Sequence, residues 1–149
     1  MRRMLPFLTL QPARGQHAAE AIGLYTSLFD EGRVVSREPW PEGAPGLETL
    51  EDPPEAVQLA EIEIIAGQRL RLSDTLIRHG WDMTPGVSLW IDCADAAEQE
   101  RVFGALVEGG MALMPLDDYG FGPFGWVQDR FGVTWQLGVA ADGLQDPAL

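Results

Sequence analysis

Residues 124–137 read FGWVQDRFGVTWQL. Within this stretch Asp129–Gly132 supplies residue types that tight turns favour, because Asp bonds to its own backbone and Gly tolerates positive φ. Apolar and polar residues alternate from Val133 to Val139, a period typical of a strand with one buried face. The stretch therefore predicts a β-hairpin that places Thr134 and Gln136 on the face opposite the core.

The elements before this hairpin alternate between strands and one helix. Asp95 followed by Glu98 resembles a capping box and predicts a helix start, and the pair Gly109-Gly110 predicts its end. Side chains of the strand predicted over 87–93 alternate in the same way, with Ser88 and Trp90 on the face opposite Leu89 and Ile91. The expected strands of this half are 87–93, 111–116, 124–128 and 133–139.

The first half of the chain repeats that order of elements. Apolar residues three and four apart predict a helix over 17–29, and Gly67 marks a turn between two strands. The expected strands are 5–11, 33–39, 56–66 and 68–74. Residues 40–55 are rich in Pro, Gly and acid, which predicts a long exposed loop, either a connection or a lid. Residues 75–86 are expected to be a linker.

The repeated order predicts an α+β fold of tandem βαβββ modules, at about 5–74 and 87–139, within a single domain of residues 1–149. Neither half would bury a sheet face alone. We therefore expect the two modules to form one curved, cup-shaped mixed sheet with the helices outside.

Charge excludes several classes of partner. The net charge is −13, from 10 basic and 23 acidic residues, and every basic residue is Arg. Nucleic acid and anionic membranes need a concentrated cationic face, so neither is expected as a partner. The N-terminal MRRMLPFLTLQ is interpreted as a strand rather than a signal peptide, and no segment reaches the roughly 20 apolar residues of a membrane span. A cytoplasmic protein is expected, with the single Cys93 buried and inert.

Three stretches carry a resemblance to a known superfamily: AAEAIGLYTSLF (18–29), AEIEIIAGQRLRLSD (60–74) and PLDDYGFGPFGWVQDRFGVTWQL (115–137). The chain resembles the vicinal oxygen chelate superfamily, which includes glyoxalase I, bleomycin-resistance proteins and extradiol dioxygenases. Within it, the chain looks like the PhnB-like branch. The resemblance implies tandem βαβββ modules that form a cup, usually in a homodimer.

The resemblance also implies where a metal would bind. Its last ligand is typically a Glu four residues after the hairpin Gly, and this chain has Gln136 there, a neutral and weaker ligand. The usual His position falls in Pro85–Ser88, and the first strand offers Thr9 or Gln11 but no His. We interpret His17 as opening the first helix and His79 as a linker residue, both in contact with solvent. We therefore expect no metal and no cofactor.

Glu61 and Glu63 lie on one face of a predicted strand, so they could chelate a metal. Paired charges on a strand more often face water, so we interpret this pair as a solvated edge.

No known catalytic constellation appears. The chain has no nucleophile elbow, no phosphate-binding GxxxxGK[ST] and no GxGxxG that opens a helix. GFGPFG (120–125) leads into a strand and is interpreted as a turn or an aromatic flap. Some PhnB-like sequences are described as demethylubiquinone methyltransferases, but the nucleotide-binding loop expected for such an enzyme is missing.

A small organic ligand in a metal-free cup is therefore the preferred function, because a large aromatic group beside small hydrogen-bonding groups suits an amphipathic molecule. The predicted ligand-binding residues are Phe7, Thr9, Ser88, Trp90, Trp126, Thr134 and Gln136. The alternative is a metal-dependent lyase, isomerase or dioxygenase with an altered site built on Gln136, Glu61 or Glu63. A third reading is a structural dimer without a ligand.

Overall fold

The computed structural model describes residues 1–141, except for the side chain of Pro54. The chain divides into two compact units, Met1–Gly80 and a second that starts at Trp81. Each unit contains one of the two βαβββ modules expected from the sequence. Whether the two act as a single domain remains a prediction.

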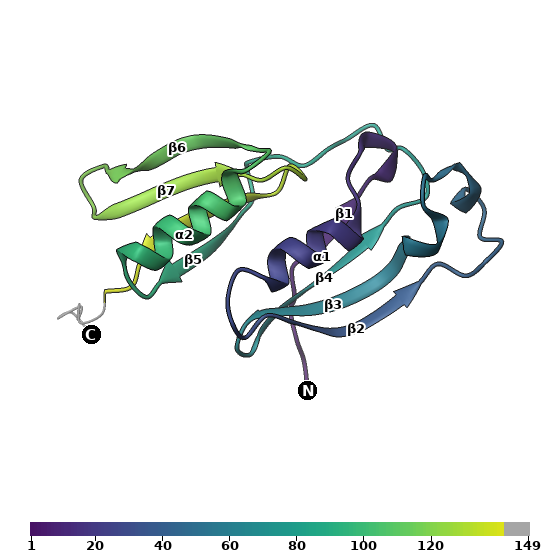
Figure 1. Ribbon diagram of the computed structural model, residues 1–149, viewed down its shortest axis with the longest axis horizontal. Coiled ribbons are helices and arrows are strands. Elements are labelled where there is room, and N and C mark those ends of the chain that lie inside the picture. The colour runs from purple at the N-terminus through teal and green to yellow at the C-terminus, as the bar shows by residue number, and fades with distance from the viewer. Residues whose placement is uncertain (142–149) are drawn as a thin grey trace. The chain divides into compact units, whose positions relative to one another are not determined.

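The first unit is a four-stranded sheet covered on one face by a helix (Figure 1). Its order is β1-β4-β3-β2, with β1 parallel to β4 and the other pairs antiparallel. The elements are β1 (Phe7–Leu10), α1 (Ala18–Thr26), β2 (Arg33–Pro39), β3 (Val57–Ile65) and β4 (Gln68–Asp74).

One carboxylate ties the start of α1 to the first sheet. The two oxygens of Asp74, at the end of β4, accept hydrogen bonds from the backbone N–H groups of Ala18 at 2.8 Å and Val57 at 2.9 Å. An N–H in the first turn of a helix has no partner within the helix, so this contact supplies one. The helix then buries Ala21, Ile22 and Tyr25 against the sheet, because these apolar residues recur at helical spacing.

The second unit has the same topology, with order β5-β8-β7-β6 and β5 parallel to β8 (Figure 1). Its elements are β5 (Ser88–Cys93), α2 (Ala96–Val107), β6 (Met111–Asp118), β7 (Pro123–Gln128) and β8 (Thr134–Val139). Its buried core includes Ile91, Cys93, Val102, Leu106, Val127, Trp135 and Leu137. These positions share one face of each element, as the alternation predicts.

The predicted capping box is present at the start of α2. Asp95 Oδ1 accepts a hydrogen bond from the N–H of Glu98 at 2.8 Å, and Glu98 Oε1 accepts one from the N–H of Ala94 at 2.8 Å. The second bond reaches one residue before the cap. Both bonds satisfy backbone donors at the helix start, where the helix itself offers no acceptor.

The hairpin within residues 124–137 has its turn at Asp129–Gly132, as predicted. Asp129 is 1% exposed, and its Oδ1 accepts bonds from the N–H groups of Phe131 and Val133. Its Oδ2 accepts a bond from the indole N–H of Trp135 at 2.9 Å. Gly132 has φ 88°, a value that costs glycine little. Strand β8 begins at Thr134, one residue later than expected.

Most described residues of the loop over 40–55 are exposed, as expected, but the loop is partly ordered by local structure. Two short 3₁₀ helices interrupt it, Leu47–Thr49 and Pro53–Glu55. Leu47 is buried, and the indole N–H of Trp40 donates to the carbonyl of Asp74 at 2.8 Å. One buried apolar side chain without periodicity gives no signal that a pattern search detects.

The fold is therefore α+β, with tandem βαβββ modules and two open mixed sheets. In each unit the helix packs on one face of the sheet, and within residues 1–141 the other face, called here the open face, carries no helix of its own unit. The open faces are where the predicted site residues lie.

Candidate functional site

Strand register places five of the predicted ligand-binding residues on the open face of the second sheet. Across the parallel pair, Ser88 lies opposite Thr134 and Trp90 opposite Gln136. Across the antiparallel pair, Trp126 lies opposite Gln136. The sequence alternation correctly predicted this face. That these residues bind a ligand stays a prediction.

A directed chain of hydrogen bonds fixes the side chains at one end of this face. The indole N–H of Trp126 donates to Ser88 Oγ at 3.1 Å, and Ser88 Oγ lies 2.7 Å from Thr134 Oγ1. The hydroxyl of Thr134 donates to the carbonyl of Val87 at 2.9 Å. Since each hydroxyl has one proton, the Ser88 proton is directed at Thr134. Both hydroxyl donors are therefore used internally, so Ser88 and Thr134 position Trp126.

Gln136 differs from its neighbours on this face. Its side chain is half-buried, and within residues 1–141 its amide forms no hydrogen bond. An amide offers two donors and one acceptor. Of the five predicted ligand-binding residues on this sheet, Gln136 is the one with a polar side chain free to bind a ligand. It lies opposite two aromatic residues, Trp90 and Trp126.

The other end of the open face is an aromatic cluster that the sequence analysis largely missed. The Trp90 and Phe124 rings stack with centroids 5.8 Å apart, and Phe121 and Tyr119 lie edge-on to Phe124 at 5.3 and 6.1 Å. The indole N–H of Trp90 donates to Asp92 Oδ1 at 2.8 Å. Phe124 faces Gly138 across the sheet, and that register is the signal that would have identified it. The expected aromatic flap over 120–125 contributes Phe121, which is 67% exposed.

Phe7 and Thr9 lie on the open face of the first sheet, in the other unit. Phe7 lies opposite Arg71, and Thr9 lies opposite Ser73. Phe7 is 54% exposed and Thr9 is half-buried. These two residues therefore belong to a different unit from the five on the second sheet.

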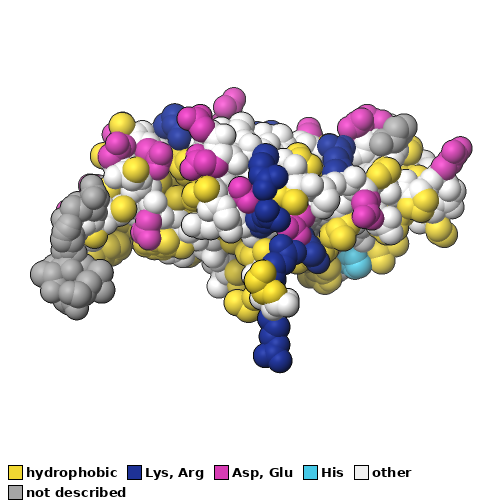
Figure 2. Space-filling view, turned by 90° about the horizontal axis from the view of Figure 1, so that it is seen from below, with side chains coloured by type: hydrophobic (Ala, Val, Ile, Leu, Met, Phe, Trp, Pro, Cys, Tyr) yellow, Lys and Arg dark blue, Asp and Glu magenta, His cyan; other side chains and the backbone are white. Residues whose placement is uncertain are grey.

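The open face of the first sheet is charged rather than aromatic. Glu61 accepts two bonds from Arg3, at 2.9 and 3.0 Å, one from Arg69 at 3.1 Å and one from Arg71 at 3.0 Å. Glu63 pairs with Arg69 at 2.9 Å and Arg33 at 3.4 Å. Figure 2 shows a face of the molecule on which arginine side chains lie directly beside acidic ones.

The interpretation of Glu61 and Glu63 as a solvated edge is wrong. Strand β3 lies inside the sheet, between β4 and β2, and the two residues are only 6% and 8% exposed because arginine side chains cover them. The pKa of Glu61 lies far below its ordinary value, first through the hydrogen bond from Arg3 and then through those from Arg71 and Arg69. The pKa of Glu63 is also lowered, chiefly by Arg69. Both carboxylates are therefore engaged as ion pairs.

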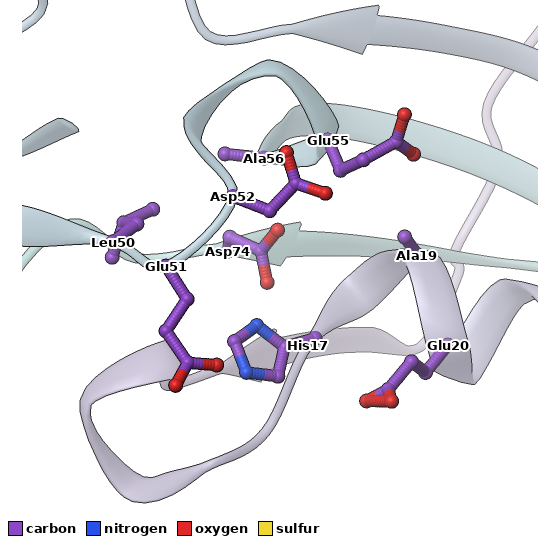
Figure 3. A pocket seen from close by; sticks show the side chains of 9 residues that line it. All are labelled: His17, Ala19, Glu20, Leu50, Glu51, Asp52, Glu55, Ala56 and Asp74. Carbon is purple, nitrogen blue, oxygen red and sulfur yellow. The ribbon is translucent and has the colours of Figure 1, made fainter. Parts of the chain in front are cut away.

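A cavity of about 250 Å³ lies elsewhere in the first unit (Figure 3). Figure 3 shows the imidazole of His17 near the carboxylates of Glu51 and Asp74. Burial raises the pKa of Asp74, although the bonds from Val57 and Ala18 act in the opposite direction. The expectation of a solvated His17 is only partly met, because His17 is half-buried against this cavity.

His79 is also more engaged than expected for a linker residue. Its Nε2 lies 2.9 Å from Thr75 Oγ1, and its backbone N–H donates to Gln11 Oε1 at 2.8 Å. Its carbonyl accepts a bond from Arg14 at 2.6 Å. The residue holds the segment after β4 against the start of the chain.

Metal-binding side chains do not converge in the part of the chain that the structure describes. Over residues 1–141, no group of three or more His, Cys, Asp or Glu side chains is placed so that it could hold a metal ion. The absence of a resident metal nevertheless remains a prediction, because a metal can also use Gln or backbone oxygens.

The tandem βαβββ fold with open sheets defines the class of fold, which is similar to that of a glyoxylase/bleomycin resistance protein/dioxygenase domain. Within that class, the chain belongs to the PhnB-like family whose model, described as 3-demethylubiquinone-9 3-methyltransferase, matches residues 3–138.

Two solved structures are similar in sequence as well as fold. The PhnB protein of Bacillus cereus is 34% identical, with a TM-score of 0.79, and the match covers 93% of this chain and all of that one. Protein PA1353 of Pseudomonas aeruginosa is 26% identical with a TM-score of 0.75, over 93% of this chain and 98% of that one.

A third structure supports the fold alone. The glyoxylase/bleomycin resistance protein/dioxygenase domain of Frankia sp. EAN1pec is 11% identical with a TM-score of 0.61, covering 96% of this chain and 94% of that one. A search of curated proteins gives no match. Among the described residues, neither helix is long and apolar enough to cross a membrane.

Proposed function

We propose that the protein binds a small amphipathic organic molecule on the open face of the second sheet, without a metal. The observation that carries this proposal is the free amide of Gln136, which lies opposite both Trp90 and Trp126 on neighbouring strands. Binding sites of this kind combine aromatic surface with a few polar groups that fix orientation. The hydrogen-bond chain through Ser88 and Thr134 supports the proposal, because it holds Trp126 in one orientation before a ligand arrives.

Binding is proposed in preference to methyl transfer, although the family description names a methyltransferase. Nucleotide cofactors commonly bind at a glycine-rich turn between a parallel strand and the following helix. In the second unit only Ala94 and Asp95 separate β5 from α2. That connection is too short to form such a loop.

Binding is also proposed in preference to metal chemistry. The alternative depends on Glu61, Glu63 or Gln136 as ligands. Both glutamates are held in ion pairs with arginine, and a cation would have to displace those arginines. No observation among the described residues favours the metal-dependent alternative over binding.

The experiment is a ligand screen by native mass spectrometry on the full chain, as isolated and after incubation with small molecules. We expect a retained organic molecule whose occupancy falls at least tenfold in Gln136→Ala. The matched control is Gln58→Ala, an exposed glutamine on β3 in the other unit. Equal occupancy in the wild type and both variants would remove Gln136 from the site and contradict the proposal.

A homodimer is proposed as the assembly, in line with the superfamily resemblance. The open face of the first sheet exposes the large apolar side chain of Phe7 on β1, and exposed apolar surface often marks an interaction site. Sedimentation at micromolar concentration would contradict the dimer if it gave only the 16.3 kDa chain. The cytoplasmic location expected from the sequence is likewise a proposal, and cell fractionation would test it.

A further inference from the structure

The side chain of Trp90 is held at the second sheet by two neighbours. A Cβ atom at Gly138 would lie 2.8 Å from Cζ2 of Trp90, so the indole ring occupies the space that any other residue at 138 would fill. The same ring donates its N–H to Asp92 Oδ1 at 2.8 Å. The missing side chain of Gly138 therefore leaves room for the indole ring. Asp92, which accepts the indole N–H, restricts the rotation of that ring.

Although these two neighbours fix the ring, the described residues of its unit leave about half of it exposed. Trp90 is 54% exposed even though its ring edge lies close to Gly138 of β8 and Phe124 stacks with it at a centroid distance of 5.8 Å. An exposed tryptophan normally samples several rotamers, and ordering it costs binding energy. Here that cost is already met in the free protein, which leaves a flat aromatic surface available for stacking.

Charge on this sheet has one sign. Strands β5, β6, β7 and β8 contain no Arg, Lys or His, and their acidic residues are Asp92, Asp117 and Asp118. Asp92 lies next to the Trp90 ring, and Asp117 lies opposite Phe124 on β6. Aromatic faces attract cations through their quadrupole, and nearby carboxylates add to that attraction. The surface is therefore complementary to a planar group with positive charge and repels an anion.

We propose that the ligand of this face contains a planar aromatic cation that stacks on Trp90, and that Asp92 and Gly138 are the residues that position the indole for it. This inference rests on the proposed function, since it names the chemical class of ligand for the same face. It assigns separate tasks to two neighbouring residues: stacking to Trp90, and hydrogen bonding to Gln136.

The test uses ¹⁵N-labelled full chain and the indole N–H signals of its five tryptophans, with Trp90→Phe to assign the Trp90 signal. The probes are N-methylquinolinium (planar cation), quinoline (planar, neutral), 2-naphthoate (planar anion) and tetramethylammonium (a cation that is not planar). We expect N-methylquinolinium to shift the Trp90 signal with a Kd at least tenfold below that of 2-naphthoate. Tetramethylammonium should bind more weakly than quinoline.

Three variants separate position from charge. Asp92→Asn keeps an acceptor for the indole N–H but removes the charge, so it should reduce the preference for cation over neutral ring several-fold and leave quinoline binding intact. Gly138→Ala should weaken N-methylquinolinium and quinoline together, about tenfold or more. Asp92→Ala, at an exposed position, frees the indole without disturbing the core and should also weaken both.

The controls are Gly104→Ala, a helical glycine whose added Cβ meets nothing within 4 Å, and Glu108→Gln, an exposed acid in the same unit. Both should bind the probes as the wild type does. The inference is overturned if N-methylquinolinium leaves the Trp90 signal unmoved at millimolar concentration, if 2-naphthoate binds equally well, or if Gly138→Ala and Asp92→Ala match the controls. A retained ligand that depends on Gln136 but not on Trp90 would overturn this inference and leave the proposed function standing.

Discussion

Arg71 and Gln136 occupy the same position in the two βαβββ modules. Each lies four residues after the turn glycine, Gly67 or Gly132, and each lies opposite an aromatic residue on the neighbouring parallel strand, Phe7 or Trp90. The two modules thus place a cation and a neutral amide at equivalent positions, and the superfamily resemblance implies a carboxylate at the second of them, Gln136. The contrast makes the first sheet charged and the second aromatic.

The first prediction concerns metal content and follows from the residue types at these two positions, Arg71 and Gln136. Protein purified without a chelator should contain less than about one tenth of a transition-metal ion per chain, because neither equivalent position offers an anionic oxygen. Elemental analysis by mass spectrometry measures this, with Gln136→Ala as the comparison. One bound metal per chain that disappears in Gln136→Ala would establish the metal-dependent alternative instead.

The second prediction concerns the hairpin turn. In Asp129→Ala, the N–H groups of Phe131 and Val133 and the indole N–H of Trp135 lose their acceptors in a buried place. Each buried donor without a partner costs about 1–3 kcal/mol, so the free energy of unfolding should fall by about 3 kcal/mol or more. Urea unfolding measures the loss. Asp129→Asn keeps one acceptor oxygen and should lose less, and the reverse ranking would contradict this account.

The sequence predicted the elements well because alternation and turn chemistry are local signals. Gln136 was placed on the open face because β8 alternates without interruption, and Asp129 was assigned to the turn because Asp and Gly favour turns. The burial of Glu61 was missed for a different reason. Its cover comes from Arg3, 58 residues away in the chain, and from cross-strand neighbours on β4, and neither contact has a sequence signature.

The sheet face that carries five of the predicted site residues could be predicted from the sequence for the same reason. The five residues on the second sheet follow from strand alternation, but the use of the Ser88 and Thr134 hydroxyls depends on the register of a parallel pair far apart in sequence. Asp92 and Gly138 gain their importance from their contact with one tryptophan ring. That contact is visible only once the two strands are side by side.

The third prediction uses the lowered pKa of Glu61. A carboxyl whose pKa is lower in the folded state contributes stability that is present above its unfolded pKa and is lost as pH falls toward the folded value. The stability advantage of the wild type over Glu61→Gln should therefore shrink as pH falls below the ordinary glutamate value of 4.5. Urea unfolding at several pH values down to about 2 measures it. The exposed Glu42→Gln is the control, and an advantage that does not change with pH would contradict the ion-pair account.

The fourth prediction concerns Cys93, which is fully buried. Burial, with smaller contributions from Glu98 and Asp92, raises the pKa of the Cys93 thiol to about 11. Because the thiolate is the reactive form, the folded protein should react with a thiol reagent at pH 8 at least a hundredfold more slowly than the urea-unfolded chain. Absorbance after addition of a disulfide reagent follows the reaction. Equal rates in both states would show that the thiol is accessible.

The fifth prediction uses Asp74, where the sign of the pH effect is opposite to that at Glu61. Burial raises the pKa of Asp74 from 3.8, so the folded state holds its proton more tightly than the unfolded chain does. The resulting stability is fully present below the unfolded value and is lost as pH rises through the folded value. The advantage of the wild type over Asp74→Asn should therefore be greatest at low pH and decrease as the carboxyl ionises. Unfolding of Asp74→Asn and Glu61→Gln over one pH series checks both signs at once, because the two advantages should change in opposite directions. If the advantage over Asp74→Asn rises with pH, the bonds from Ala18 and Val57 outweigh burial and the assigned direction is wrong.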